Sequence, residues 1–183
     1  MTTEENEPEN QPERQDVLVL DQPEQLKALG HPLRLRVLEM LGTEEHEGLT
    51  NRELAQRLGV DPGHLHFHVR MLLRAGLIRL AEGGRGREKP YSSVARTIRV
   101  APELLVSEPG SDLRTAMLEQ VEKAWHAHAQ AGSFRIAQVS ARISPEQALT
   151  LITELVEKAR DLEQPQYEPL VVTTVFHPPT QDG

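Results

Sequence analysis

The strongest fold signal in the chain is TNRELAQRLGVDPGHLHFHVRMLLRAG, residues 50–76. Thr50 and Glu53 have the spacing of a capping box and predict a helix that begins there and ends at Gly59. Asp61, followed by a proline, predicts the cap and first turn of a second helix. Two capped helices joined by a tight turn that contains glycine form a helix-turn-helix arrangement.

Two short helices are predicted upstream of this pair, over residues 23–29 and 32–41, from apolar residues at helical spacing. Gly30 and His31 separate them. We expect the His31 ring at this break to have a structural role and to hydrogen-bond the backbone.

Two strands are predicted downstream, at residues 77–80 and 91–94, joined by a loop rich in glycine and arginine. This hairpin would form a wing beside the two capped helices. The sequence therefore predicts a winged helix-turn-helix DNA-binding domain over residues 17–100. Before it, residues 1–16 are rich in Glu, Gln, Asn and Pro and predict a disordered acidic arm.

A second region follows a proline-containing linker at residues 101–111. Asp112 is predicted to cap a long helix, and alternating or β-branched residues predict strands at 134–143 and 170–176 with another amphipathic helix between them. We therefore expect a C-terminal domain over residues 112–183 with a small β-α-β region. Two strands make a thin sheet, so a partner is expected to complete it. The whole fold is predicted to be mainly α with minor β.

The charge is distributed unevenly along the chain. The formal net charge is −8, but residues 1–16 carry six acids and one base, and residues 100–183 carry twelve acids and six bases. Residues 52–99 carry ten bases and four acids, a balance of +6. A basic stretch that coincides with a helix-turn-helix pattern is typical of a nucleic-acid interface.

Several classes of protein and site are excluded by composition. The chain has no cysteine, which rules out disulfides and thiolate metal sites. It has no apolar run near the roughly 18 residues that a membrane span needs, and its acidic start is unlike a secretion signal. We therefore expect a cytoplasmic protein.

The second helix of the motif has two distinct faces. At about 100° per residue, Leu65, Val69 and Leu72 fall on one side, toward a core. The opposite side, called the recognition face below, comprises Gly63, His64, His66, Phe67, Arg70 and Arg74. Arg70 can make a bidentate contact with guanine and Phe67 can touch a thymine methyl group. Phe67 could instead pack against the wing.

Two further groups are predicted to contact DNA. The start of the first motif helix contributes Thr50, Asn51 and Arg52, which would hold phosphates. The wing tip contributes Arg85, Arg87 and Lys89, which would lie beside the DNA backbone or in the minor groove. The wing tip could instead be simply flexible.

The histidines do not predict a metal site. On a helix, His66 lies about 160° from His64, so at most His64 and His68 could share an ion. Acids and other histidines are scattered, and the glycine-rich segment at residues 83–86 has no helix after it that could cradle a phosphate. We therefore predict no metal, no cofactor and no catalytic residue.

Residues 26–94 resemble the ArsR-type winged-helix family of transcriptional repressors. The resemblance rests on ALGHPLRLRVL at 28–38, LTNRELA at 49–55, HVRML at 68–72 and AGLI at 75–78. Metal sensors of that family use a cysteine pair that this chain lacks, so it resembles a non-thiolate branch with a C-terminal extension. The resemblance implies a dimer that places the second motif helix in the major groove.

These features, with the family resemblance, predict a sequence-specific transcriptional repressor that binds a palindromic operator in double-stranded DNA as a homodimer. The predicted dimerisation stripe on the long helix comprises Leu113, Met117, Val121 and Trp125. The C-terminal region could hold a small-molecule effector or only build the dimer. The alternative functions are a winged helix used for protein interaction and, less favoured, a small enzyme.

Overall fold

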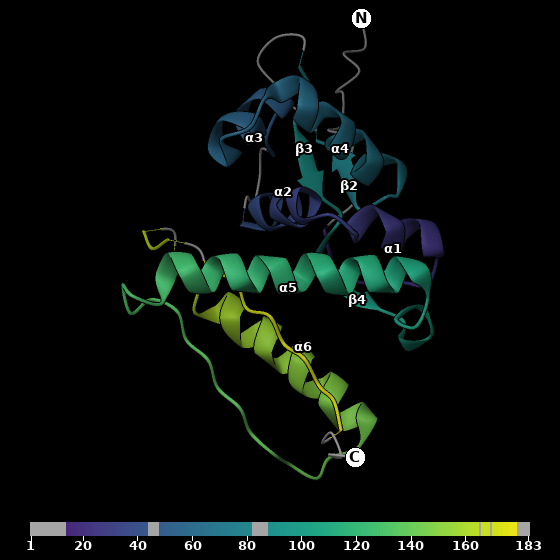
Figure 1. Cartoon of the computed structure of the whole chain (residues 1–183), viewed down its shortest axis with the longest axis vertical. Coiled ribbons are helices and arrows are strands. Elements are labelled where there is room, and N and C mark those ends of the chain that lie inside the picture. Colours follow the sequence, from purple (N-terminus) through teal and green to yellow (C-terminus); the bar gives the residue numbers. More distant parts are fainter. Residues whose placement is uncertain (1–13, 44–47, 82–87, 165, 169, 179–183) are drawn as a thin grey trace, which may run out of the picture. The chain divides into compact units, whose positions relative to one another are not determined.

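The chain folds as a mainly helical protein with a minor β component, as the sequence predicts (Figure 1). The computed structural model describes residues 14–43, 48–81, 88–164, 166–168 and 170–178. The chain divides into two compact units, one that runs to His128 and one that begins at Ala129. Each unit is described separately below.

Within the described residues, the first unit contains five α-helices. They are α1 (Pro23–Leu29), α2 (Pro32–Thr43), α3 (Asn51–Leu58), α4 (Pro62–Arg74) and α5 (Glu108–His128). The predicted capping box at Thr50 and Glu53 begins α3, and Gly59 ends it with φ of 67°, a left-handed conformation that favours glycine. The Asp61 side chain accepts a hydrogen bond of 2.8 Å from the His64 amide and caps α4. The predicted helix-turn-helix is therefore confirmed in its caps and its turn.

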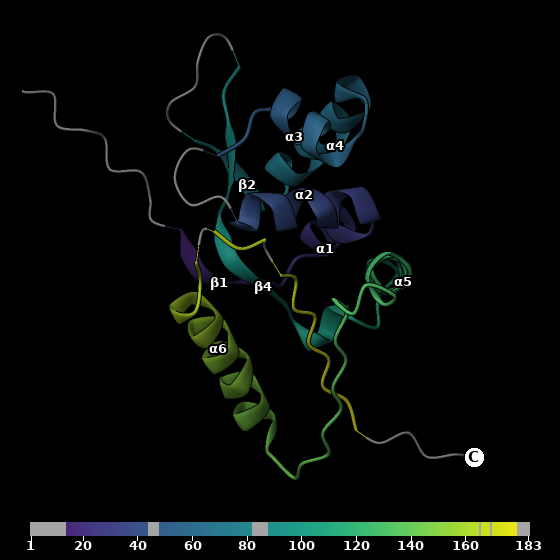
Figure 2. The ribbon, with the colours of Figure 1, turned by 90° about the vertical axis from the view of Figure 1, so that its left-hand side faces the viewer.

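The described part of the first unit also contains four strands. β2 (Ile78–Leu80) and β3 (Tyr91–Ser93) pair antiparallel and form the predicted hairpin, whose loop at residues 82–87 lies outside the described residues. β1 (Gln15–Leu20) and β4 (Ala95–Val100) pair in parallel, side by side in Figure 2. Neither of these two strands was predicted, and β1 begins inside the segment expected to be a disordered arm. Residues 1–13 of that arm lie outside the described residues.

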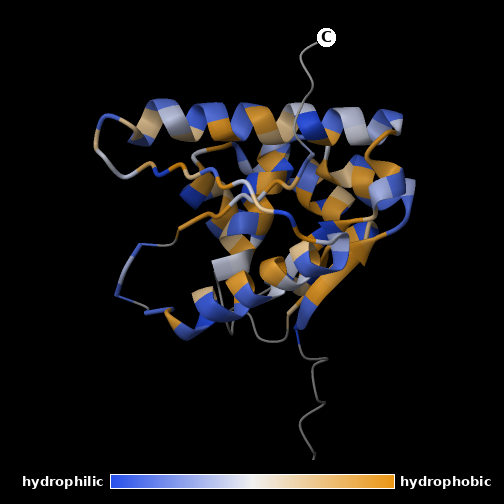
Figure 3. Ribbon diagram, turned by 90° about the horizontal axis from the view of Figure 1, so that it is seen from below, coloured by the Kyte–Doolittle hydropathy of each residue, from blue (hydrophilic) through white to orange (hydrophobic). Residues whose placement is uncertain are grey.

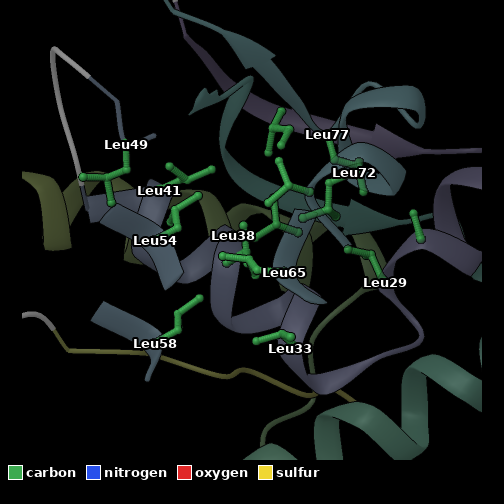
Figure 4. Close-up of a cluster of buried hydrophobic side chains, with 14 of the residues drawn as sticks. Leu29, Leu33, Leu38, Leu41, Leu49, Leu54, Leu58, Leu65, Leu72 and Leu77 are labelled. Carbon is green, nitrogen blue, oxygen red and sulfur yellow. The ribbon is translucent and has the colours of Figure 1, made fainter. Parts of the chain in front are cut away.

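One hydrophobic core holds the first unit together (Figure 4). Many of its leucines come from the helices α1 to α4, and Leu77 is the residue directly before β2. The core leucines include Leu29, Leu38, Leu54, Leu65, Leu72 and Leu77. Removing apolar surface from water contributes about 25 cal/mol per Å². The core thereby fixes the inner face of α4 against α1 and α2 and leaves the opposite face of α4 in solvent.

The helix α5 belongs to the first unit, which corrects two predictions. It begins at Glu108, so Asp112 lies inside the helix and does not cap it. Leu113 and Ala116 are buried where α5 packs against α1 and α2, so the units divide at His128 and not at the predicted linker of residues 101–111. That segment contains a 3-10 helix, η1 (Pro102–Leu104), and the first turn of α5.

The second unit contains the predicted helix α6 (Pro145–Asp161), which begins with a capping box between Ser144 and Gln147. The predicted strands at residues 134–143 and 170–176 are not formed, and both segments are irregular. A strand needs neighbours for its backbone hydrogen bonds, and two segments of one chain supply only a marginal sheet. None of the residues of α6 is buried.

No helix among the described residues combines the length and the apolar character that a membrane-spanning segment requires.

Candidate nucleic-acid interface

The outer face of α4 presents all six residues of the predicted recognition face to solvent. Leu65, Val69 and Leu72 are buried on the opposite side, as the helical periodicity predicts. Phe67 is 65% exposed, although apolar burial would normally draw a phenylalanine into the core. Phe67 does not pack into the core, so its ring is exposed on the same face of α4 as the side chains of Arg70 and Arg74.

A shallow surface hollow runs along this face of α4. It is lined by Gly63, His66, Phe67, Arg70, Met71 and Arg74. Five of these six residues belong to the recognition face, and Met71 is the addition. The absence of a side chain at Gly63 leaves the backbone open at the N-terminal end of the hollow, where α4 also has its positive dipole end.

The start of α3 is engaged in structural hydrogen bonds. The Thr50 hydroxyl donates to Oε2 of Glu53 at 2.8 Å, and the Thr50 amide donates to the same oxygen at 2.8 Å. These hydrogen bonds lower the pKa of the Glu53 carboxyl, so the capping group is charged at neutral pH. Nδ2 of Asn51 donates to the carbonyl of Pro62 at 2.9 Å. Of the three residues predicted to hold phosphates here, Arg52 is exposed, whereas Thr50 and Asn51 are half-buried.

The wing is described only in part. Lys89 is exposed beside β3, while Arg85 and Arg87 lie outside the described residues. The backbone of Tyr91 exchanges two hydrogen bonds with Leu49, at 2.8 and 2.9 Å, so the wing is joined directly to the segment that precedes α3. The hairpin and the motif helices therefore form one continuous body.

The burial of two polar residues was not predicted from the sequence, and both lie beneath α4, called the recognition helix below. His68 lies on the inner face of α4 and is 5% exposed, and Arg34 of α2 is 6% exposed. Nη1 of Arg34 lies 3.3 Å from Nδ1 of His68. The position of His68 three residues after Leu65 and four before Leu72 was the available signal, because those spacings share one helix face.

His31 lies against His68, with their ring centroids 4.4 Å apart. Nδ1 of His31 accepts a hydrogen bond of 3.1 Å from the amide of Leu33, in the first turn of α2. The predicted backbone hydrogen bond of His31 is thus confirmed. His64 is the third ring of this group, with its centroid 4.9 Å from that of His68.

Burial and neighbouring positive charge disfavour protonation of His68 and His31. Burial, followed by His31, Arg34 and His64, lowers the pKa of His68 to about 4. Burial, with Arg34 next, also lowers the pKa of His31. The described residues contain no group of three or more His, Cys, Asp or Glu side chains arranged to hold a metal ion.

The predicted dimerisation stripe on α5 is divided by the fold. Leu113 is buried within its own chain at 4% exposed, and Met117 packs partly against the same core. Val121 and Trp125 are exposed, and Leu118, which was not predicted, is 63% exposed. Figure 3, coloured by hydropathy, shows hydrophobic and hydrophilic residues interspersed along the long helix α5.

Comparison with known families matches residues 29–81 to a family described as a helix-turn-helix domain. The match begins at the end of α1 and ends just after β2, so it contains α2, α3 and the whole recognition helix. A search of curated proteins gives no match for the chain. The helix-turn-helix match indicates a DNA-binding regulator.

Proposed function

We propose that the chain is a sequence-specific transcriptional repressor of the ArsR-like type that binds a palindromic operator as a homodimer and has no catalytic activity. The observation that carries the proposal is the outer face of α4. An exposed aromatic ring at Phe67 stands beside Arg70 and Arg74 on the second helix of a helix-turn-helix. Exposed side chains of this kind suit the edges of base pairs in a major groove.

Four residues of the recognition face have a chemical role in this proposal. Arg70 donates two hydrogen bonds to one guanine, because a guanidinium matches the O6 and N7 acceptors of that base. Phe67 contacts a thymine methyl group. Gly63 allows the DNA backbone to come close to the helix. Arg74, one turn further along α4, contacts a base edge or the flanking phosphate.

Other residues hold the backbone without selecting sequence. Arg52 at the start of α3 and Lys89 on the wing are exposed and positively charged, so both suit phosphate contacts. Thr50 and Asn51 act indirectly, since their side chains form the cap of α3 and its link to α4. Arg85 and Arg87 would add charge at the wing tip.

Dimerisation is proposed through α5. Leu118 and Val121 lie one turn apart on its exposed side, and apolar side chains at that spacing are typical of helix pairing. Two recognition helices related by twofold symmetry would lie about 34–36 Å apart and meet two half-sites of a palindrome. The second unit could complete a sheet across the dimer, since the segments at 134–143 and 170–176 carry the alternating or β-branched residues that favour strands. It could also take a small-molecule effector.

Selection of bound sequences from a random duplex pool tests the DNA proposal. We expect a palindromic consensus, and a log affinity that falls with log salt by about 0.9 per phosphate contact. Arg70→Ala should abolish the preference for that consensus and retain non-specific binding. Arg99→Ala on β4 removes the same charge away from α4 and is the matched control. No enrichment from the pool, together with no salt dependence, would instead indicate a protein-interaction module.

Sedimentation of the full chain tests the dimer proposal. Leu118→Glu should convert a dimer to a monomer, because a charge would be buried without a partner in the pairing surface. Ala127→Glu introduces the same charge at an exposed position on the side of α5 opposite Leu118, and should leave the dimer intact. A wild-type chain that sediments as a monomer, or a Leu118→Glu variant that remains dimeric, would contradict pairing through α5.

A further inference from the structure

Arg34 is a buried cation surrounded by uncharged groups. It lies in the first turn of α2, and its Nε donates to the carbonyl of Ala28 while Nη2 donates to the carbonyl of Lys27 at 3.1 Å. Both carbonyls belong to the last turn of α1, the end of a helix where free carbonyls and the helix dipole attract positive charge. One side of the guanidinium therefore caps α1.

The other side of the same guanidinium faces the recognition helix. Nη1 lies 3.3 Å from Nδ1 of His68 and 3.7 Å from Sδ of Met71. An arginine has only donors, so Nδ1 of His68 must be the acceptor and the neutral ring carries its proton on Nε2. His68 and Met71 immediately follow Phe67 and Arg70 in sequence, so Arg34 contacts α4 directly beneath the two residues proposed to specify bases.

Burying an arginine in this space costs desolvation free energy, because its charge is removed from water. Apolar residues of similar volume often stabilise a core as well as, or better than, buried charge. What an arginine adds is a rigid, planar set of donors with fixed directions. Here those donors join three helices, because they contact the end of α1 and the inner face of α4 from a position on α2.

We propose that Arg34 is a positioning residue for DNA recognition, which sets the rotation of α4 about its axis through His68 and Met71. This inference rests on the proposed function. A side chain lies about 5–6 Å from the helix axis, so a rotation of 10° moves it by roughly 1 Å. A displacement of that size takes a hydrogen bond outside its normal range of about 2.7–3.2 Å. Arg70 and Phe67 would then miss their bases while phosphate contacts persisted.

A purely structural role predicts a different result. If Arg34 only capped α1, its loss would lower the folded fraction, and the folded molecules would keep their operator preference. If it positions α4, folded molecules lose preference. His68→Phe separates the two roles, because it keeps a ring in the core and removes the acceptor on α4 while the contacts of Arg34 with α1 remain.

The experiment measures affinity for the selected operator and for a random duplex, with the full-length chain at a temperature where circular dichroism shows each variant to be folded. The variants are Arg34→Met, His68→Phe and the double variant, with Arg36→Met as control. Arg36 is an exposed arginine on α2 whose Nη2 lies 3.4 Å from the carbonyl of Leu58, so it contacts α3 and not α4.

We expect both single variants to lose about tenfold in the ratio of specific to non-specific affinity, which is the range of one base contact. The salt dependence should be unchanged, and the double variant should lose no more than the worse single variant. Arg36→Met should retain the wild-type ratio. An unchanged ratio in folded Arg34→Met, or a loss there that His68→Phe does not share, would overturn the inference. A wild-type chain without any operator preference would overturn the proposed function, and the inference with it.

Discussion

Nδ2 of Asn51 donates a hydrogen bond of 2.9 Å to the carbonyl of Pro62, which joins the first residue of α3 to the first residue of α4. The two helices of the motif are thus linked at their N-terminal ends as well as through the core. The angle between the helices of such a motif determines how the second one enters a groove. A single amide side chain contributes to that geometry from outside the hydrophobic core.

Asn51→Ala should lower the free energy of unfolding by about 1 kcal/mol, because the Pro62 carbonyl loses its hydrogen-bond donor. Urea unfolding followed by circular dichroism measures the change. Gln56→Ala, at an exposed position of the same helix, should change stability by less than about 0.5 kcal/mol. Equal effects of the two substitutions would show that the hydrogen bond to Pro62 contributes nothing measurable.

Asp61→Ala should destabilise the protein by about 1 kcal/mol, because the His64 amide at the start of α4 loses its side-chain acceptor. Asp61→Asn keeps an oxygen acceptor at the same place and should recover most of that loss. Thermal unfolding of the three proteins side by side makes the comparison. If Asn destabilises as much as Ala, the carboxylate charge and not the hydrogen bond stabilises the helix start.

Gly30→Ala should destabilise the contact between α5 and the first two helices. A Cβ at Gly30 would lie 2.7 Å from Cβ of Asp112, closer than packed carbon atoms allow, so α5 must shift. The expected cost is about 1–3 kcal/mol, typical of overpacking. Gly42→Ala is the control, because its nearest neighbour would be the Arg14 side chain at 3.7 Å and alanine favours the helix. We expect it to be neutral or stabilising in chemical denaturation, and a neutral Gly30→Ala would contradict the close approach.

Acid should weaken the fold through His68. Its pKa is about 4 in the folded chain and 6.5 ordinarily, so between these pH values the unfolded chain binds a proton that the folded chain does not. The contribution of His68 to stability is therefore complete above pH 6.5 and is lost as the pH falls toward 4, up to about 3 kcal/mol in total. Arg34, His31 and His64 face the ring, and a proton on it would add charge beside them.

Urea unfolding at a series of pH values tests this dependence. His68→Gln should reduce the slope of unfolding free energy against pH in that window, since the substituted side chain does not titrate while His31, whose pKa is also lowered, still does. His66→Gln removes an exposed histidine of the same helix and should leave the slope unchanged. A slope in His68→Gln as steep as that of the wild-type chain would assign the acid sensitivity to other groups.

The helices α3 and α4, their caps and the recognition face could all be predicted from the sequence. The interactions that define them are local. Thr50 reaches Glu53 and Asp61 reaches His64 within one turn, and the 3.6-residue period alone separates Leu65 from Phe67. The surrounding structure was not needed to tell which side of α4 would face solvent.

Features that depend on contacts distant in sequence could not be predicted. β1 pairs with β4 across about eighty residues, and the segments expected to be strands in the second unit are irregular where the structure describes them. Arg34 looks like an ordinary surface arginine, since that residue type is almost never buried unless its donors are satisfied. The folded chain satisfies them with two carbonyls of α1 and the His68 ring, acceptors that only come together when α1, α2 and α4 pack. Local spacing thus predicts which side chains of α4 face solvent, whereas the packing of α1, α2 and α4 determines the orientation of the helix that carries them.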